Sequence, residues 1–319
     1  MSVRFDGRVA IVSGGARGLG FAHANLLASL GAAVVVNDIG SAVDGQGASG
    51  DVAHEAVAVL QRAGYTAVAS TDSITGRTGA QAVVQTAIDS FGKVDILVNN
   101  AGIALQKPVD ELTDQDFEKV LRVHVWGSFY LTSAVWRGMR EQRYGRVLNT
   151  TSNVALLGSA NHSSYAAAKG ALFGMTKALA VEGRQFGIAV NALAPIARTR
   201  MNEEAIRKGR ADANPARREM LDALERTMAL LDPENVAAVA AWLVHEDCPV
   251  TGEVFAAAGG RAGRCFVGFT PGYTDHGLTI DDVQNHFDEI RSTEGFLEFA
   301  TSAEELTYLD QVLPQASEA

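Results

Sequence analysis

A glycine-rich segment between a predicted strand and a predicted helix most strongly constrains how this chain folds. The apolar run Arg8–Val12 leads into Ser13–Gly20, and a helical pattern follows from about Phe21 to Leu30. Glycines in such a loop allow a tight turn and let backbone N–H groups approach a pyrophosphate at the start of the helix. The alternative interpretation of this segment is a glycine turn that merely joins two elements. The order of the following elements argues against it, since a second strand, Ala33–Asn37, comes next and is followed by Asp38. An acid about 20 residues after such a loop is placed to accept hydrogen bonds from an adenosine ribose.

Strand and helix patterns alternate along most of the chain. Further strands are predicted near Ala67–Thr71, Val94–Asn99, Arg146–Thr151, Ile188–Ala194 and Glu253–Ala257. Helical patterns lie between them, at about Val52–Ala63, Gly79–Phe91, Thr113–Arg140, Ser163–Phe186 and Pro233–His245. Alternation of this kind predicts right-handed crossovers and a parallel sheet. We therefore expect an α/β fold with a doubly wound, seven-stranded parallel sheet of the Rossmann type, and a site beyond the carboxyl ends of the strands.

Tyr165 and Lys169 stand one helical turn apart, and Ser152 follows the fifth predicted strand. Residues four apart share a face of a helix. An ammonium beside a phenol can lower the pKa of that phenol from its ordinary value of ~10. Such a pair suits proton transfer to or from an alcohol oxygen, although tyrosine and lysine also occur at this spacing by chance.

Together these motifs resemble those of the short-chain dehydrogenase/reductase family, from about Phe5 to Gly260. The resemblance implies catalytic roles for Ser152, Tyr165 and Lys169. It also implies cofactor contacts from the glycine loop and from the Asn-Asn-Ala-Gly motif, Asn99–Gly102, after the fourth strand. A further contact is implied from the acid that follows the third strand, Asp72. The cofactor-binding residues expected on this basis are Gly14, Arg17, Gly18, Leu19, Gly20, Asp38, Asp72, Ser73, Asn99, Ala101, Gly102, Lys169 and Thr199, and no metal site is expected.

Two positions depart from the family pattern. His124 stands where most members have an asparagine that supports a water relay from the lysine, and a neutral imidazole can still donate and accept hydrogen bonds. His124 is therefore a candidate relay residue; the alternative is a core histidine with its hydrogen bonds met internally. The family's Pro-Gly after the sixth strand is Pro195-Ile196 here, and Thr199 is the candidate contact for the nicotinamide carboxamide.

Asp38 and Arg17 point to different cofactors. Arg17 occupies a loop position where NADP-dependent members of the family often carry a phosphate-binding arginine. Asp38 opposes NADP, because a carboxylate beside a 2′-phosphate is a close pair of like charges. The next residue, Ile39, is apolar and offers no compensating charge. We therefore predict NAD as the cofactor.

A long insertion from Ile39 to Ser49 resembles the dehydrogenase domain of the peroxisomal multifunctional enzymes of type 2. This resemblance implies oxidation of a secondary alcohol on a bulky apolar substrate. A 17β-hydroxysteroid is the first expectation, and a (3R)-3-hydroxyacyl-CoA is the alternative. A catalytically silent NAD-binding scaffold or sensor is the alternative from another class. Seven basic residues between Arg198 and Arg218 outnumber three acids, an excess that suits either coenzyme A phosphates or a solvated helix face.

Composition argues against several other classes of protein. Hydrophobic residues make up 47% of the 319 residues, which argues against disorder, and no apolar run reaches the ~20 residues of a membrane span. The N-terminus has no cleavable signal pattern, and Cys248 and Cys265 suit a reducing compartment. We expect a cytoplasmic protein with a small lipid-like substrate and no nucleic-acid partner. The family resemblance implies a homodimer or homotetramer.

The C-terminal stretch carries the net charge of −10. From Asp275 to Ala319 there are eleven acidic residues and one base, Arg291. Helical patterns at about Thr279–Ile290 and Ser302–Val312 include aromatic and aliphatic residues, so we expect this stretch to pack on the rest of the chain or on a neighbouring subunit. The predicted organisation is a dehydrogenase domain, 1–262, with a helical lid at about 199–231, and an acidic C-terminal extension, 263–319.

Overall fold

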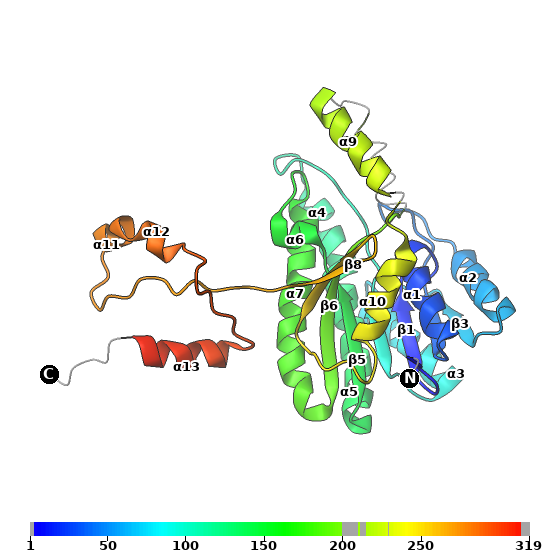
Figure 1. Cartoon of the computed structure of the whole chain (residues 1–319). Helices are drawn as coiled ribbons and strands as arrows, with labels where there is room; N and C mark the ends of the chain where they lie inside the picture. The colour runs from blue at the N-terminus through cyan, green and yellow to red at the C-terminus, as the bar shows by residue number, and fades with distance from the viewer. Residues whose placement is uncertain (1–2, 200–209, 211–214, 229, 314–319) are drawn as a thin grey trace. The chain divides into compact units, whose positions relative to one another are not determined.

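The computed structural model describes residues 3–199, 210, 215–228 and 230–313 of the chain (Figure 1). Internal contacts divide the chain into two units, Met1–Arg264 and Cys265–Ala319. This division lies within the last strand of the sheet, just past the boundary expected at residue 262. Much of the lid expected at 199–231 lies outside the described residues.

One sheet organises the larger unit, with the strand order β3-β2-β1-β4-β5-β6-β7-β8. Neighbouring strands from β3 through to β7 pair in parallel. This order, in which β1 lies between β2 and β4, confirms the doubly wound α/β fold. The strands are β1 (Val9–Ser13), β2 (Ala33–Asn37), β3 (Ala67–Ser70), β4 (Ile96–Asn99), β5 (Gly145–Thr150), β6 (Ile188–Ile196), β7 (Val254–Ala258) and β8 (Arg261–Cys265).

The expected number of seven strands is wrong by one, because the chain adds β8 beside β7. Only Gly259 and Gly260 connect these two strands, and their φ angles are 52° and 80°. Two residues with positive φ form the kind of tight turn that joins antiparallel neighbours. The apolar pattern gives no sign of β8, because its residues are half-buried or exposed.

Helices cover both faces of the sheet. β1 shows the division, since Ala10 and Val12 belong to one hydrophobic core and Val9 and Ile11 to the other. The first core also contains residues of α1 (Gly18–Ser29), α2 (Asp51–Arg62) and α10 (Pro233–Leu243). The second contains residues of α3 (Arg77–Phe91), α5 (Gly127–Gln142) and α7 (Ser163–Gly183). The remaining elements among the described residues of this unit are α4 (Asp114–Leu121), η1 (Arg122–Trp126), α6 (Asn153–Leu157), η2 (Arg184–Phe186) and α9 (Pro215–Met228).

The helix expected over residues 113–140 is interrupted. It begins with a capping box, in which the Thr113 side chain accepts from the Asp116 N–H and the Asp116 side chain accepts from the Thr113 N–H. After α4, the five residues of η1 form a π-helical turn before α5 continues. π-helical turns inside helices are frequent at functional sites. This one carries His124.

The C-terminal unit contains α11 (Ile280–Asn285), α12 (Phe287–Ile290) and α13 (Ser302–Val312), where helical patterns are predicted. Within the unit, an antiparallel bridge pairs Phe269 with Leu297. None of its described residues is buried, and its packing on another surface stays a prediction. In the part of the chain that the structure describes, no helix is both long and apolar enough to cross a membrane.

Candidate active site

A cleft of about 1220 Å³ lies beyond the carboxyl ends of β1 to β6. The residues that follow these strands form its walls, as expected for a doubly wound sheet. The predicted site residues that border this cleft are Gly14, Arg17, Gly18, Leu19, Gly20, Asp38, Asp72, Ser73, Ala101, Gly102, His124, Ser152, Tyr165, Lys169 and Thr199. The fold therefore brings together all but one of them.

The glycine loop forms one wall by close approach of backbone to backbone. Gly14 has a φ of 61°, and a Cβ there would lie 2.9 Å from the Cα of Ala101. A Cβ on Gly20 would lie 1.9 Å from the carbonyl oxygen of Gly14. Side chains at these positions would push the loop away from its neighbours, so the glycines keep the start of α1 open to the cleft. Arg17, at the N-cap of α1, is exposed.

Asp38 is held beside this loop by two backbone groups. Its carboxylate accepts the N–H of Ala16 at 3.2 Å and the N–H of Gly40 at 2.8 Å. The insertion that follows reaches the segment after β4, where the Ala104 N–H donates to the carbonyl of Val43 at 3.1 Å. The insertion therefore spans one end of the cleft.

The two asparagines of the motif after β4 have different tasks. Asn99, 2% exposed, does not border the cleft; its amide donates to Asn149 Oδ1 at 2.9 Å and to Thr132 Oγ1 at 3.1 Å. Asn100 does border it, and its amide donates to the Gly14 carbonyl at 3.1 Å. Neighbouring residues of a strand point to opposite sides. The structure therefore gives no support to a cofactor contact from the Asn99 side chain, and Asn100 takes its place among the candidates.

Ser152, Tyr165 and Lys169 meet just beyond β5. Ser152 is the N-cap of α6, and its hydroxyl accepts the N–H of Val154 at 3.2 Å. Lys169 is only 3% exposed. Its Nζ donates to the carbonyl of Thr150 at 2.6 Å and lies 5.8 Å from the centroid of the Tyr165 ring. The phenol and the amine thus face the same space, as their spacing on the helix predicts.

Burial dominates the electrostatics of these groups. It raises the pKa of Tyr165, and a hydrogen bond with Ser152 opposes that rise. It lowers the pKa of Lys169 to about 7. A low-dielectric site disfavours the charged forms of both the phenol and the amine. For Tyr165 desolvation exceeds the opposing hydrogen bond, so its pKa lies above the ordinary value. The expected lowering of this pKa by Lys169 stays a prediction.

His124 lies in this space with one nitrogen unsatisfied. Its Nε2 is 3.1 Å from the N of Ile103 and 2.9 Å from the O of Ile103, but its Nδ1 has no partner among the described residues. Burial, with a smaller contribution from the Lys169 charge, lowers the pKa of His124 to about 3, so the imidazole is neutral. The alternative of a core histidine with every hydrogen bond met internally therefore does not hold for Nδ1.

Gly102 makes room for this imidazole. A Cβ on Gly102 would lie 2.3 Å from Cε1 of His124, which is 1% exposed. The His124 ring also meets the Tyr165 ring edge-on, with centroids 5.4 Å apart. The glycine after β4 and the π-helical turn therefore together set the distance between His124 and the phenol.

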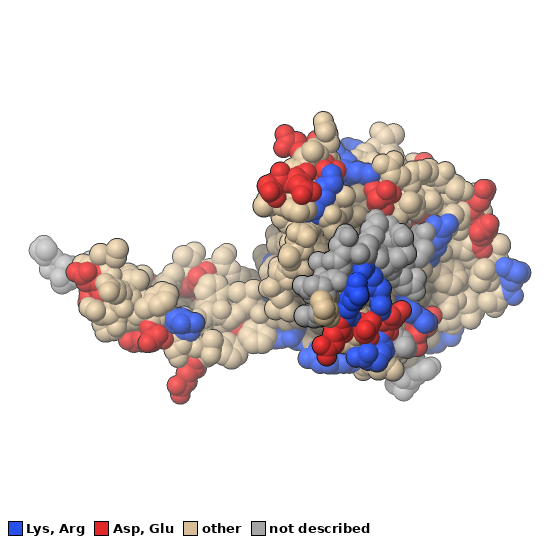
Figure 2. All heavy atoms as spheres, turned by 90° about the horizontal axis from the view of Figure 1, so that it is seen from above, with Lys and Arg blue, Asp and Glu red and all other residues tan. Residues whose placement is uncertain are grey.

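The described part of the lid carries both signs of charge. Leu221 and Met228 of α9 border the cleft, and Arg210 pairs with Asp222 at 2.7 Å and also with Glu225. Figure 2, seen from above, shows basic and acidic side chains next to each other on this face. Of the basic residues expected to suit coenzyme A, Arg200, Arg207 and Lys208 lie outside the described residues. Arg210 is neutralised by its neighbours.

Sequence reasoning missed several residues that border the cleft. They include Ile74, Asn100, Ile103, Val154, Asn161 and His162. Only His162 had a usable signal, because it stands three residues before Tyr165 and therefore near the same face of α7. The others come from loops whose positions depend on the whole fold.

Comparison with known proteins gives the same assignment. The family model for short chain dehydrogenase matches residues 8–209. A peroxisomal multifunctional enzyme type 2 of Mus musculus is 38% identical over 262 residues, which are 82% of this chain and 33% of that protein. The chain therefore spans about a third of the length of this relative. A hydroxyacyl-CoA dehydrogenase of Mycobacterium tuberculosis is 38% identical over 207 residues, 62% of this chain and 64% of the relative.

Solved structures share the fold. Full-length peroxisomal multifunctional enzyme type 2 from Drosophila melanogaster has a TM-score of 0.77 and 29% identity, over 98% of this chain and 50% of that one. A 7α-hydroxysteroid dehydrogenase complexed with NADH and 7-oxo glycochenodeoxycholic acid has a TM-score of 0.69 and 30% identity. The match covers 81% of this chain and 95% of that one. Since the family model covers more than half of the residues, the chain belongs to the short-chain dehydrogenases, oxidoreductases that use NAD or NADP.

Proposed function

We propose that this protein is an NAD-dependent dehydrogenase that oxidises (3R)-3-hydroxyacyl-CoA thioesters to the 3-ketones. The meeting of Ser152, Tyr165 and Lys169 in one cleft with Asp38 supports the chemistry. The names of the relatives favour a thioester, because one of them is a hydroxyacyl-CoA dehydrogenase. A 17β-hydroxysteroid, the first expectation from the sequence, becomes the second candidate. It is supported by the likeness to a hydroxysteroid dehydrogenase.

The cofactor end of the cleft fits NAD. The N–H groups at the start of α1 would hold the pyrophosphate, and Asp38 would accept hydrogen bonds from the adenosine ribose. Two backbone N–H groups already orient the Asp38 carboxylate. A 2′-phosphate would meet this fixed negative charge, whereas the exposed Arg17 can turn to solvent. The repulsion from the Asp38 carboxylate therefore outweighs the attraction of Arg17, which favours NAD over NADP.

The reaction at the substrate end is a proton transfer coupled to oxidation. Bound NAD supplies the hydride acceptor. Ser152 hydrogen-bonds the substrate oxygen, and Tyr165 takes the proton of the hydroxyl. Burial disfavours the phenolate, and the hydrogen bond with Ser152 opposes that effect. We assign Lys169, whose Nζ lies 5.8 Å from the centroid of the Tyr165 ring, to stabilise the phenolate as well when its amine is protonated. His124, neutral and with Nδ1 unpartnered among the described residues, is assigned as the relay that connects Lys169 to solvent.

Initial rates of NADH formation test this proposal. A medium-chain (3R)-3-hydroxyacyl-CoA and 17β-estradiol are compared as substrates, each with NAD and with NADP. We expect turnover of the thioester with NAD to exceed the other combinations. Strong turnover of estradiol with little of the thioester would establish the steroid candidate instead. Failure with every secondary alcohol would leave the silent scaffold.

A further inference from the structure

His162 borders the cleft without a task in the proposed reaction. It is the N-cap residue of α7, three residues before Tyr165. Its ring lies beside the Tyr165 ring, with centroids 6.3 Å apart and planes at 70°. The residue is half-buried, so its hydrogen bonds are partly shielded from water while a substrate can still reach it.

One hydrogen bond decides which nitrogen of the His162 ring carries a proton. Nδ1 lies 2.7 Å from the carbonyl oxygen of Ala160. A carbonyl only accepts, so Nδ1 carries the proton, and in a neutral imidazole Nε2 is then an acceptor. The ring makes no other hydrogen bond to the described residues. Nε2 is therefore available to a donor in the cleft.

An unusual turn keeps this ring in place. Asn161 has a φ of 63°, and Arg143 is the other non-glycine residue with positive φ in the described parts of the chain. The Asn161 carbonyl accepts the N–H of Lys107 at 3.0 Å, and Lys107 pairs with Asp116 at 2.6 Å. Such backbone conformations persist where the surroundings hold them, and they gather at functional sites. The segment after β4 thus braces the turn that presents His162.

We propose that Nε2 of His162 accepts a hydrogen bond from the first amide N–H of the pantetheine arm, and that this contact selects CoA thioesters over other alcohols. The inference rests on the proposed function. In a 3-hydroxyacyl-CoA, the thioester carbonyl is an acceptor and cannot bond to this nitrogen. The carbinol hydroxyl is engaged by Ser152 and Tyr165. The next donor along the molecule is the pantetheine amide, and a steroid alcohol has no N–H at all.

Two short thioesters of one (3R)-3-hydroxyacyl chain separate this contact from the chemistry. The thioester of N-acetylcysteamine carries the amide, and the thioester of a straight-chain alkyl thiol of similar length does not. The substrates are compared in wild type, His162→Phe and His162→Gln. Phenylalanine keeps a planar ring beside Tyr165 without a nitrogen, whereas glutamine keeps an acceptor. The affinity of each variant for NADH reports whether it is folded.

For His162→Phe we expect kcat/KM on the amide thioester to fall roughly three- to tenfold, mostly through KM, as for one neutral hydrogen bond. Its kcat/KM on the alkyl thioester should not change, and His162→Gln should recover most of the loss. Equal losses on both thioesters would overturn the contact, because His162 would then act through Tyr165. Unchanged kinetics on both would also overturn it. If wild type oxidises estradiol but neither thioester, the proposed function fails and the contact fails with it.

Discussion

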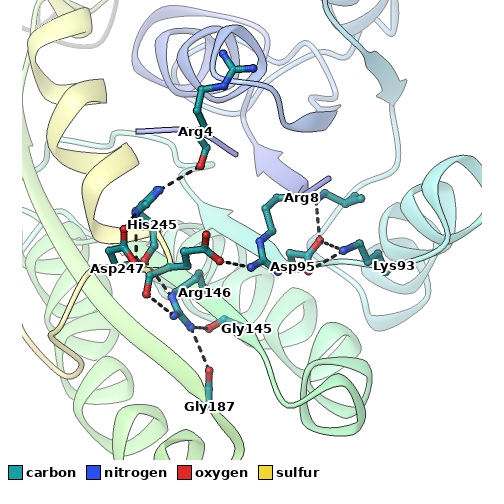
Figure 3. A network of polar contacts seen from close by, with 11 residues as sticks. Arg4, Arg8, Lys93, Asp95, Gly145, Arg146, Gly187, His245 and Asp247 are labelled. Atoms are coloured by element: carbon teal, nitrogen blue, oxygen red, sulfur yellow. Dashed lines mark hydrogen bonds and ion pairs between the residues drawn. The ribbon is translucent and has the colours of Figure 1, made fainter. Parts of the chain in front are cut away.

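The two ends of the parallel strands, the amino edge and the carboxyl edge of the sheet, differ in how their buried functional groups are paired. At the amino edge, charged groups are matched (Figure 3). Asp95, 2% exposed, accepts the N–H of Val9 at 2.8 Å and pairs with Arg8 at 3.4 Å and with Lys93 at 3.0 Å. The Arg146 guanidinium donates to four backbone carbonyls. These contacts join β1, β4 and β5 to the chain after α10.

At the carboxyl edge, buried polar atoms lack partners among the described residues. Nδ1 of His124 and the hydroxyl of Thr150 are such atoms, and both residues border the cleft. His245 at the amino edge differs, since Nε2 contacts the Arg4 carbonyl at 3.1 Å and Nδ1 accepts the Asp247 N–H at 3.2 Å. Unpaired buried groups cost stability. The amino edge has one such atom as well, the Tyr144 hydroxyl, but its buried charged group Asp95 is paired. The carboxyl edge places its unpartnered groups at the cleft.

Replacing Tyr165 by phenylalanine should break the chemistry of the carboxyl edge and leave the amino edge intact. Loss of the proton acceptor should lower kcat about a thousandfold. NADH binding, measured by fluorescence, and the urea midpoint should change little. A variant that kept most of its turnover would remove Tyr165 as the base.

Replacing Asp95 by alanine should do the reverse. The Val9 N–H and the Arg8 guanidinium would lose a buried acceptor, so the free energy of unfolding should fall by about 3 kcal/mol. Urea denaturation measures this loss. The kcat below the unfolding transition should match wild type, and Asp95→Asn, which keeps an acceptor, should lose less. A fall in kcat in the folded variant would show that the two edges are coupled.

Lys169→Met should stabilise the protein while abolishing turnover. The folded pKa of Lys169, about 7, lies below its unfolded value, so the unfolded chain binds more protons between pH 7 and roughly 10.5. The contribution of this lysine to stability therefore rises with pH across that window and is lowest at pH 7 and below. Without NAD, the variant should be more stable than wild type by roughly 1 to 3 kcal/mol at pH 7. This advantage should shrink as the pH approaches 10. Equal differences at both pH values would contradict a buried, charge-penalised lysine.

Two glycine-to-alanine changes give the smallest effects and opposite signs. Gly102→Ala would press on the buried His124 ring, so it should cost about 1 to 2 kcal/mol of stability and reduce turnover. Gly138 is exposed within α5, and a Cβ there would meet no described atom within 4 Å. Gly138→Ala should add about 0.5 to 1 kcal/mol because alanine favours helix. Thermal unfolding and rates measured side by side check both; a stabilised, fully active Gly102→Ala would show that the cleft is looser than described.

Local sequence features were enough to predict the first strand–loop–helix–strand unit and part of the candidate site. The glycine loop at Ser13–Gly20, Asp38 after β2 and the Tyr165–Lys169 pair were each readable from nearby residues. Turn geometry, strand alternation and the helical repeat depend on short stretches of chain, so these features do not require knowledge of distant contacts. The same reasoning placed most strands within a residue or two.

The sequence by itself therefore determined the order of strands and helices, the glycine loop and the position of Ser152, Tyr165 and Lys169 in one cleft. Only the tertiary structure decided that Asn100 rather than Asn99 borders the cleft, that His124 lies in a π-helical turn against Gly102, and that burial shifts the pKa of Lys169 to about 7. Desolvation and close packing depend on neighbours from segments that are far apart in the chain, so a local sequence pattern cannot predict them.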